Sequence, residues 1–417
     1  MKNSVFHKYG DKLLFILALA VLATAIFRFG GKAIANVANP PIVFTQWWQD
    51  DIGKEALLDI IEEFEKFNEG IKIILNTTPY EDLRSVLLYS ANPASADDIS
   101  PDSFPGDIIA LDPLWVPELL KKGIIEDPVI RVAQGSGEGL LSFINVLYYN
   151  IEILREAGFS MPPKSRGDFL NQTRALCNKE EGRWGLAMGG NSSRGISDDV
   201  LPWIWAAGIE LIKDGKPEVN SRQVTESLAF LSILNSEGII APGAFSADNN
   251  KKLEDFILGR AAFIIAPASD IDFLREYMGD EQLGVTSVPA PDNYTGKTFF
   301  GSAAWTAGVY SYSAHKEEAR LFLDFLASKT STLSAKLKAT PGYSVLPDGD
   351  SFYSKVWDIA IAGENARDFA GLPWGELEII FKEGLYLLFA DKYSPAETAG
   401  TIQAKWEAAI LSHSKVF

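Results

Sequence analysis

The chain has 417 residues, of which 47% are apolar, a formal net charge of −17 and a single cysteine. This length exceeds one ordinary hydrophobic core and predicts two or three domains. The negative charge argues against partners such as nucleic acid or an anionic membrane surface. Because Cys177 is alone, an intramolecular disulfide and a cysteine-based metal cage are excluded.

The N-terminal segment has the layout of an export signal. Lysines precede an uncharged apolar run over residues 13–27, and an Ala-x-Ala site follows at residues 33–35. Residues 1–35 are predicted to be a cleaved signal peptide or, because Arg28 and Lys32 are unusual before a cleavage site, a retained signal-anchor. Both interpretations place the rest of the chain in the periplasm or on the outer face of the cytoplasmic membrane. Residues 36–41 are predicted to be a linker.

The next segments alternate between strand and helix patterns. In chain order, they predict a strand over 42–45, a helix over 54–68, a strand over 71–75, a helix near 80–89, a strand over 108–111 and a helix over 116–123. The first three form a βαβ unit, whose strands are parallel. The alternation predicts a doubly wound α/β domain.

Ligands of doubly wound sheets bind at the carboxyl ends of the strands. Two predicted strand ends deliver aromatic, amide and acidic groups to that edge, namely Gln46, Trp47, Trp48 and Asp50 after the first strand and Asp112 and Trp115 after the strand over 108–111. Neighbours on an extended chain point to opposite sides. We therefore expect one of the adjacent tryptophans to brace the loop and the other to face the crevice.

The remaining elements follow the same α/β alternation. They are predicted as a strand over 143–150, helices over 151–157, 166–178 and 221–236, a buried strand over 261–268, a β-like run over 303–313, a helix over 317–326, and a C-terminal helix that begins with a Ser394–Glu397 capping box.

Catalytic motifs are absent from the sequence. It contains no nucleophile elbow, phosphate loop, dinucleotide fingerprint or His-Glu-x-x-His motif. Catalytic residues, a cofactor and a bound metal are therefore not expected.

Aromatic residues are abundant instead. The chain has 10 Trp, 13 Tyr and 25 Phe. Their faces suit the C–H faces of sugar rings, while carboxylates and amides suit hydroxyl groups, although aromatic area equally suits core packing. Further candidates lie in segments that contain Gly or Pro, namely Trp203, Trp205, Trp305 and Trp374.

Several segments, taken in order, carry a family resemblance. They are FPGDIIALDPLWVPELLKKGIIED from residue 104, NVLYYNIEILREAGFSMPP from residue 145, ILGRAAFIIAPAS from residue 257, YSYSAHKEEARLFLDFLAS from residue 310 and GYSVLP from residue 342. Their order and spacing resemble the extracellular solute-binding proteins of ABC importers, in the large sugar-binding class that includes maltose-binding protein. The family often has Gly-Pro-Trp where this chain has Ala266-Pro267-Ala268, so that a stacking Trp is missing and Asp270 is a polar candidate.

The resemblance implies a fold of two doubly wound α/β lobes joined by a three-crossing hinge. It predicts an N-terminal lobe of residues 42–145 and 266–311 and a C-terminal lobe of residues 146–265 and 312–417. The crossings are expected near 143–149, 261–267 and 309–313. Asn145 and Tyr148 at the first crossing become ligand candidates.

The predicted function is therefore the binding component of an ABC importer, a monomer that closes on a carbohydrate and delivers it to the membrane subunits. Three alternatives remain open. Acids beside aromatics also suit a cation such as a polyamine. A secreted glycoside-active enzyme would need a carboxylate pair in the cleft. A membrane-anchored sensor or scaffold would have lost ligand binding.

Overall fold

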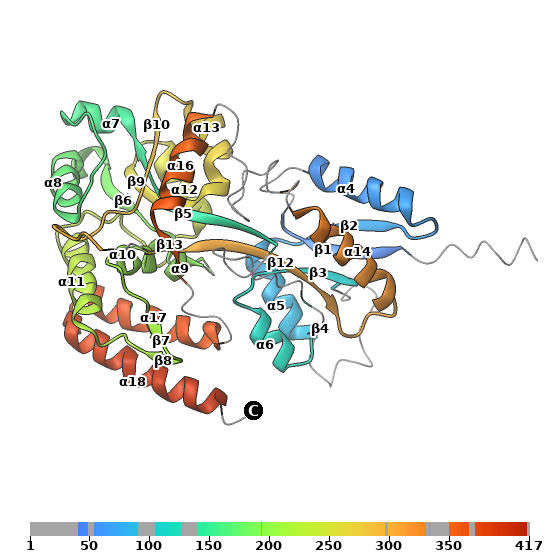
Figure 1. The fold of residues 1–417 in the computed structure, drawn as a ribbon. Coiled ribbons are helices and arrows are strands. Elements are labelled where there is room, and N and C mark those ends of the chain that lie inside the picture. Colours follow the sequence, from blue (N-terminus) through green and yellow to red (C-terminus); the bar gives the residue numbers. More distant parts are fainter. Residues whose placement is uncertain are drawn as a thin grey trace, which may run out of the picture.

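Two groups of elements, joined by long strands, make up the molecule in the computed structural model (Figure 1). The structure describes residues 41–48, 54–90, 105–126, 140–192, 194–296, 299–330, 350–366 and 372–414, together with Pro128 and Leu333. Within this part of the chain, no helix has both the length and the apolar character needed to cross a bilayer. The predicted export segment, the linker up to residue 40 and Asp50 lie outside the described residues.

The first group of elements is called the N-terminal lobe below. It contains β1 (Ile42–Gln46), α4 (Lys54–Phe67), β2 (Ile73–Thr77), α5 (Tyr80–Ser90), β3 (Ile108–Leu111), α6 (Val116–Lys121), β4 (Ile125–Glu126) and α14 (Lys316–Ser328). The central strand β1 pairs in parallel with β2 on one side and β3 on the other, which confirms the predicted βαβ unit. Helix α4 buries Leu57, Ile61 and Phe64, the apolar stripe expected from its sequence.

The second group is called the C-terminal lobe. Its first half contains α7 (Ile151–Glu156), α8 (Arg166–Leu176), β6 (Trp184–Ala187), α9 (Gly195–Asp199), α10 (Leu201–Trp205), β7 (Ile212–Lys213), β8 (Lys216–Pro217) and α11 (Arg222–Ser236). Its second half contains α12 (Asn249–Ile257), β9 (Ala261–Pro267), α13 (Ile271–Met278), β10 (Leu283–Thr286), β11 (Phe299–Phe300), α16 (Ser351–Ala362), β13 (Glu364–Asn365), α17 (Trp374–Phe389) and α18 (Pro395–Ser414).

Two strands pass from one lobe to the other. In β5 (Leu141–Asn150), residues 141–144 pair with β12 (Ser302–Tyr310), and residues 145–150 pair with β9 or β10. In β12, residues 302–305 pair with β5 and residues 306–309 pair with β3. Within the described residues, the main sheet has nine strands, and its path runs β2-β1-β3-β12-β5-β9-β6. The two lobes therefore share a continuous sheet through β5 and β12.

The first crossing lies where it was predicted, at β5, but the second does not. Strand β9, expected to cross at 261–267, pairs with β5 and β6, and the following α13 packs against α12 and β10 in the same lobe. The second crossing is β12. Helix α14 lies with the N-terminal lobe and α16 packs on β10 and β5, so the chain does not return to the C-terminal lobe at 309–313. The expected positions were wrong because a buried apolar strand has the same sequence pattern inside a lobe as at a hinge.

These crossings decide which lobe holds two segments. Helix α14, expected in the C-terminal lobe, packs on β12 and α4 through Phe322, whose ring lies 5.9 Å from that of Phe44 and 5.1 Å from that of Phe64. Helix α13 and strand β10, expected in the N-terminal lobe, lie with α12 and β5. In the described residues, 271–286 therefore belong with the C-terminal lobe and 316–328 with the N-terminal lobe.

Candidate functional site

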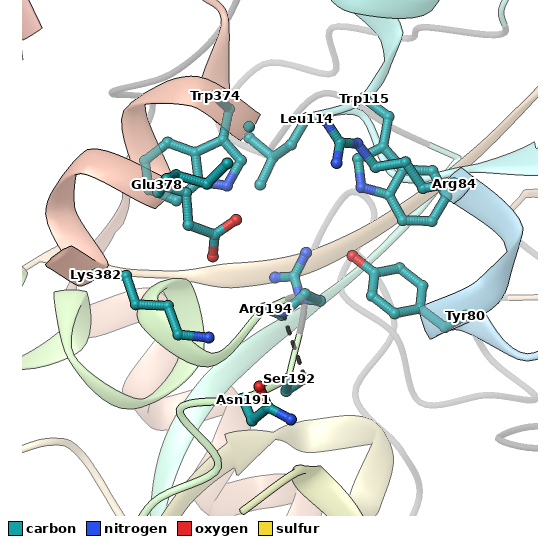
Figure 2. Close-up of a pocket in the computed structure, with 12 residues that line it drawn as sticks. Tyr80, Arg84, Leu114, Trp115, Asn191, Ser192, Arg194, Trp374, Glu378 and Lys382 are labelled. Atoms are coloured by element: carbon teal, nitrogen blue, oxygen red, sulfur yellow. Dashed lines mark hydrogen bonds between the residues drawn. The ribbon is translucent and has the colours of Figure 1, made fainter. Parts of the chain in front are cut away.

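A cavity of about 230 Å³ lies between the two lobes (Figure 2). Four pieces of the chain form its wall, namely α5, the loop from β3 into α6, the loop before α9, and the first three turns of α17. The lining residues are Tyr80, Arg84, Leu114, Trp115, Asn191, Ser192, Arg194, Trp374, Gly375, Glu378, Ile379 and Lys382.

Aromatic rings from both lobes line this cavity. On the N-terminal side, the rings of Tyr80 and Trp115 lie 4.8 Å apart, and Trp47 packs behind them, 5.0 Å from Tyr80 and 5.7 Å from Trp115. On the C-terminal side, Trp374 is the first residue of α17, and Figure 2 shows it across the cavity from Trp115. Parallel strands place these groups together, because Tyr80 follows β2 and Trp115 follows β3 at the same sheet edge.

An ion-pair network bridges the lobes at the centre of the cavity. Arg194, before α9, pairs with Asp112 of the other lobe, and its Nη2 lies 3.2 Å from Asp198 Oδ1. Tyr80 Oη donates a 2.8 Å hydrogen bond to Asp112 Oδ2, and the Leu114 backbone N–H donates to Asp112 Oδ1 at 2.8 Å. Burial opposes the charge on Arg194, but Asp198 and Asp112 outweigh it and raise the pKa of Arg194 well above its ordinary value. Arg194 is therefore charged, and it neutralises part of the acidic charge around it.

The base of α9 holds Arg194 in this position. Asp198 Oδ1 accepts a 2.8 Å hydrogen bond from Asn145 Nδ2 on β5. The next residue, Asp199, accepts from the Gly189 backbone N–H at 2.8 Å and pairs with Lys252 Nζ at 3.0 Å. Both members of the Asp199–Lys252 pair are buried, so separating them would leave a buried charge without its partner. The pair therefore fixes the segment that carries Arg194 to the C-terminal lobe.

Helix α17 brings two titratable groups to the cavity. Burial raises the pKa of Glu378 to about 8, and its buried Oε1 has no hydrogen-bond partner in the described residues. Lys382 lies one turn further along and projects into the same space (Figure 2). Across the cavity, Arg84 Nη2 donates to Glu118 Oε2 at 2.6 Å. Its guanidinium lies so close to α17 that a Cβ at Gly375 would overlap it.

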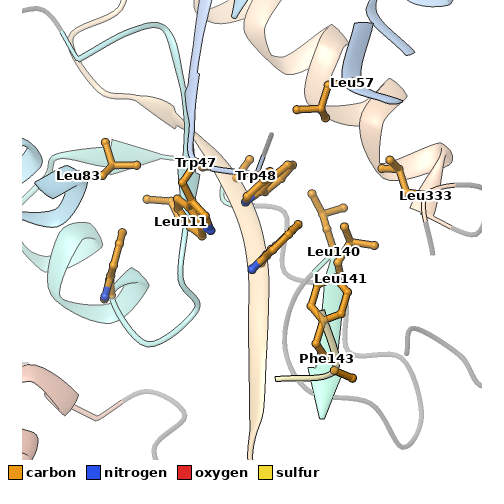
Figure 3. Packing of buried hydrophobic residues seen from close by; sticks show 14 of the residues in the cluster. Trp47, Trp48, Leu57, Leu83, Leu111, Leu140, Leu141, Phe143 and Leu333 are labelled. Atoms are coloured by element: carbon orange, nitrogen blue, oxygen red, sulfur yellow. The ribbon is translucent and has the colours of Figure 1, made fainter. Parts of the chain in front are cut away.

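Of the predicted site residues, Trp115 and Trp374 line the cavity, and Asp112 lies directly behind it as the partner of Arg194. Trp47 supports the two aromatic rings on the N-terminal side. Trp48 is fully buried and stacks on Trp305, with ring centroids 5.6 Å apart. Figure 3 shows Trp47 beside Leu111 and Trp48 on the side of Leu140. The two rings contact each other, with centroids 6.3 Å apart, both pack on Trp305, and neither lines this cavity, so the expectation that one of them faces it was wrong.

The other predicted residues lie away from the cavity. Trp203 and Trp205 are buried in the core of the C-terminal lobe. Gln46 is buried at the end of β1, and Tyr148 Oη donates to the Pro267 carbonyl at 2.9 Å. Asp270 lies in the turn before α13, where burial raises its pKa to about 7. Asn145 on β5 lines a second cavity of about 250 Å³.

Sequence reasoning missed most of the charged lining. A spacing of four residues in the sequence could have revealed part of this lining, because residues i and i+4 lie on one face of a helix. Trp374, Glu378 and Lys382 have this spacing on α17, and Tyr80 and Arg84 have it on α5. Arg194 has this spacing with Asp198, but nothing local indicates its pairing with Asp112, which is 82 residues away in the chain. In the described part of the chain, no group of three or more metal-ligating side chains is clustered.

Comparison with known proteins gives relatives in both sequence and fold. A family model described as bacterial extracellular solute-binding protein matches residues 47–332. A probable ABC transporter-binding protein of Deinococcus radiodurans is 23% identical over 283 residues. That alignment covers 62% of this chain and spans 65% of its relative's length, less than two thirds.

Two solved structures are similar to this one in fold. One is the GacH receptor of Streptomyces glaucescens, solved unliganded and with acarbose, with a TM-score of 0.72 and 16% sequence identity. The alignment covers 89% of this chain and 98% of the GacH chain. The other is the maltose-bound MalE3 of T. maritima, with a TM-score of 0.68 and 17% sequence identity. This alignment covers 88% of this chain and 99% of the MalE3 chain. These likenesses show a mixed α/β fold of the class II periplasmic-binding-protein type, as predicted.

Proposed function

The chain belongs to the family of bacterial extracellular solute-binding proteins, and we propose that it is the exported binding component of an ABC importer, which takes up a carbohydrate in the cavity between its lobes. The match to a probable ABC transporter-binding protein supports the importer part of this proposal. Structural neighbours solved with acarbose or maltose bound support the carbohydrate part.

The placement of two indoles across the cavity carries the proposal. Trp115 and Trp374 come from different lobes, so a sugar ring between them would touch aromatic surface on both sides. The rest of the lining is rich in hydrogen-bond donors, namely Arg84, Asn191, Ser192, Arg194 and Lys382. Such donors suit the hydroxyl oxygens of a sugar, and a ligand held by both lobes would favour their closure.

The same geometry argues against a polyamine. A cationic ligand needs exposed carboxylates, but Asp112 and Asp198 are both held by Arg194, and their side chains are only 2% and 11% exposed. Lining cations would also repel a polyamine. For the same reason we propose that the chain has no glycosidase activity, because this pair of acids lies behind an arginine instead of facing a substrate. Turnover of aryl-glycosides should be undetectable.

Export and attachment complete the proposal. The family is described as extracellular. We propose that residues 1–35 direct export and that the lobes work outside the cytoplasmic membrane, either free in the periplasm or anchored by residues 13–27. The permease subunits of the importer would be the partners, with this chain acting as a monomer.

Titration calorimetry with mono- and oligosaccharides, and with polyamines as competitors, tests the binding function. Wild type should bind at least one sugar, and Trp115→Leu or Trp374→Leu should weaken that binding about tenfold, since each removes one stacking face. Trp184→Leu, on β6 and outside the cavity lining, is the matched control and should change affinity less than twofold.

Two results would contradict the proposal. Binding of a polyamine without any sugar would remove the carbohydrate part. Failure to bind any solute, in protein whose circular dichroism is native, would favour a sensor or scaffold that has lost ligand binding.

A further inference from the structure

The charged groups of the cavity are unevenly arranged. Three lining side chains are cationic, Arg84, Arg194 and Lys382, whereas Glu378 is the only acid among the described lining residues. The other nearby acids lie behind the lining and are paired, Glu118 with Arg84 and both Asp112 and Asp198 with Arg194. A ligand in the cavity therefore meets donors and cations first.

Lys382 is the lining cation whose charge is least compensated. In the described residues, no carboxylate oxygen lies within 4.0 Å of its Nζ, although Glu378 is one helical turn away. Figure 2 shows the two side chains extending from α17 toward the centre of the cavity. An ammonium at the wall of a small cavity attracts an anionic group more strongly than the same ammonium in open solvent.

Glu378 does not supply the missing negative charge at neutral pH. Burial is the main cause of its raised pKa of about 8, and Arg194 and Lys382 oppose that rise while Asp198 and Asp112 add to it. Below this value the carboxyl group carries a proton, which makes it a hydrogen-bond donor. Among the residues that the structure describes, its buried Oε1 has no hydrogen-bond partner, so a ligand oxygen can supply one.

We infer that the solute is an acidic sugar, a single pyranose ring whose carboxylate is bound by Lys382 and Glu378 while the ring lies between Trp115 and Trp374. This inference rests on the proposed carbohydrate-binding function. The cavity of about 230 Å³ is below the roughly 300–1,000 Å³ of drug-sized ligand pockets, which suits one ring better than an oligosaccharide. One ammonium and one protonated carboxyl group match the two oxygens of a carboxylate.

Charge-matched sugars test the inference. Calorimetry should compare glucuronate with glucose and glucosamine, and galacturonate with galactose and galactosamine, so that each series keeps the ring and changes its charge from −1 to 0 to +1. In the series that is bound, the uronate should bind at least tenfold tighter than the neutral sugar, and the amino sugar weakest. If a neutral sugar binds as tightly as its uronate, the acidic-sugar inference fails and the proposed function stands. If no carbohydrate binds, both fail.

Lys382→Gln locates the charge recognition. It should weaken uronate binding about tenfold more than binding of the neutral parent sugar, because the charge-assisted hydrogen bond is lost while the amide keeps a neutral donor for a hydroxyl group. Lys392→Gln, at an exposed position after the end of α17, is the matched control and should leave both affinities unchanged. Equal losses of acidic and neutral sugar in Lys382→Gln would overturn the role assigned to this residue.

Glu378→Gln tests the second contact. Wild-type affinity for the uronate should fall as the pH rises from 6.5 to 9, because Glu378 loses its proton and repels the ligand. In Glu378→Gln this fall should disappear, since an amide keeps its donor at every pH. A variant that retains the wild-type pH dependence would contradict the inference.

Discussion

At the scale of the residue, the cavity shows how burial changes what a side chain does. Arg194 stays charged because two carboxylates surround it, whereas Glu378 has no cation within ion-pair distance among the described residues and holds its proton to about pH 8. Tyr80 donates to Asp112, and burial raises its pKa well above the ordinary value, so it remains a neutral donor. The protonation state of each group follows from two effects, the burial that disfavours its charged form and the charges of the side chains nearest to it.

Glu378 also predicts a pH dependence of stability. Its pKa is about 8 in the folded protein against an ordinary value of 4.5, so between these pH values the folded state holds a proton that the unfolded state has lost. Stability from this group is therefore complete below about pH 4.5 and falls as the pH rises to about 8. Glu378→Gln should raise the free energy of unfolding at pH 8 by about 4 kcal/mol and leave it nearly unchanged at pH 4.

Guanidinium unfolding of both proteins at several pH values measures this difference. Glu383→Gln, on the exposed side of the same helix, is the control and should follow the wild-type profile. Parallel profiles for wild type and Glu378→Gln would contradict the prediction.

At the scale of the element, helices set the shape of the site by where they begin. Helix α5 begins at Tyr80 and α17 begins at Trp374, so the first turns of both helices face the cavity. Helix α17 is held from behind by α18, where Trp406 Nε1 donates to the Leu377 carbonyl at 2.9 Å. Support of α17 by α18 thus fixes the position of Trp374, Glu378 and Lys382.

The start of α18 provides a test at this scale. Ser394 and Glu397 form the predicted capping box, in which the Ser394 N–H donates to Glu397 Oε2 at 2.8 Å and the Glu397 N–H donates to Ser394 Oγ at 3.2 Å. Ser394→Ala should lower the free energy of unfolding by about 1 kcal/mol, because a backbone donor loses its acceptor. Ser412→Ala, in the last turn of the same helix, should change it by less than about 0.5 kcal/mol. Chemical denaturation measures both, and equal effects would argue against the cap.

At the scale of the whole molecule, the cavity exists only because the lobes meet. Asp112 and Arg194 pair across it, and Arg84 of one lobe reaches the start of α17 in the other. Both strands that join the lobes, β5 and β12, lie side by side in the sheet. The protein's own charges therefore contribute to holding the lobes together in this arrangement.

Asp112→Asn tests that contribution. The amide can keep the contacts to Tyr80 and Leu114 but removes the negative charge that attracts Arg194, so closure should be weaker and the radius of gyration of the ligand-free protein larger by small-angle X-ray scattering. Asp255→Asn is the matched control, because Asp255 pairs with Lys251 and Arg260 within one lobe. A radius of gyration equal to that of the control would show that the ion pair does not hold the lobes together.

Much of the fold could be predicted from local pattern. Apolar periodicity located the strands and helices of the first lobe, and parallel pairing of β1 and β2 followed from the helix between them. The capping box at Ser394 was readable because its partners are three residues apart. Assignment of α13 and α14 to lobes failed, since membership of a lobe depends on long-range packing such as that of Phe322 on Phe44.

The site divides in the same way. By itself, the sequence determined that aromatic and acidic groups gather at the carboxyl ends of the strands, because the alternation of strands and helices already implies a parallel sheet with such an edge. Trp115 and Asp112 do lie at that edge, beside the cavity. Only the tertiary structure decided that Trp48, Trp203 and Trp305 are core while Trp374 lines the cavity, because an aromatic side chain carries the same local signal in both settings. Only the tertiary structure, too, brought Arg194 to Asp112 and shielded Glu378 from water, since charge and burial depend on what the folded chain places nearby.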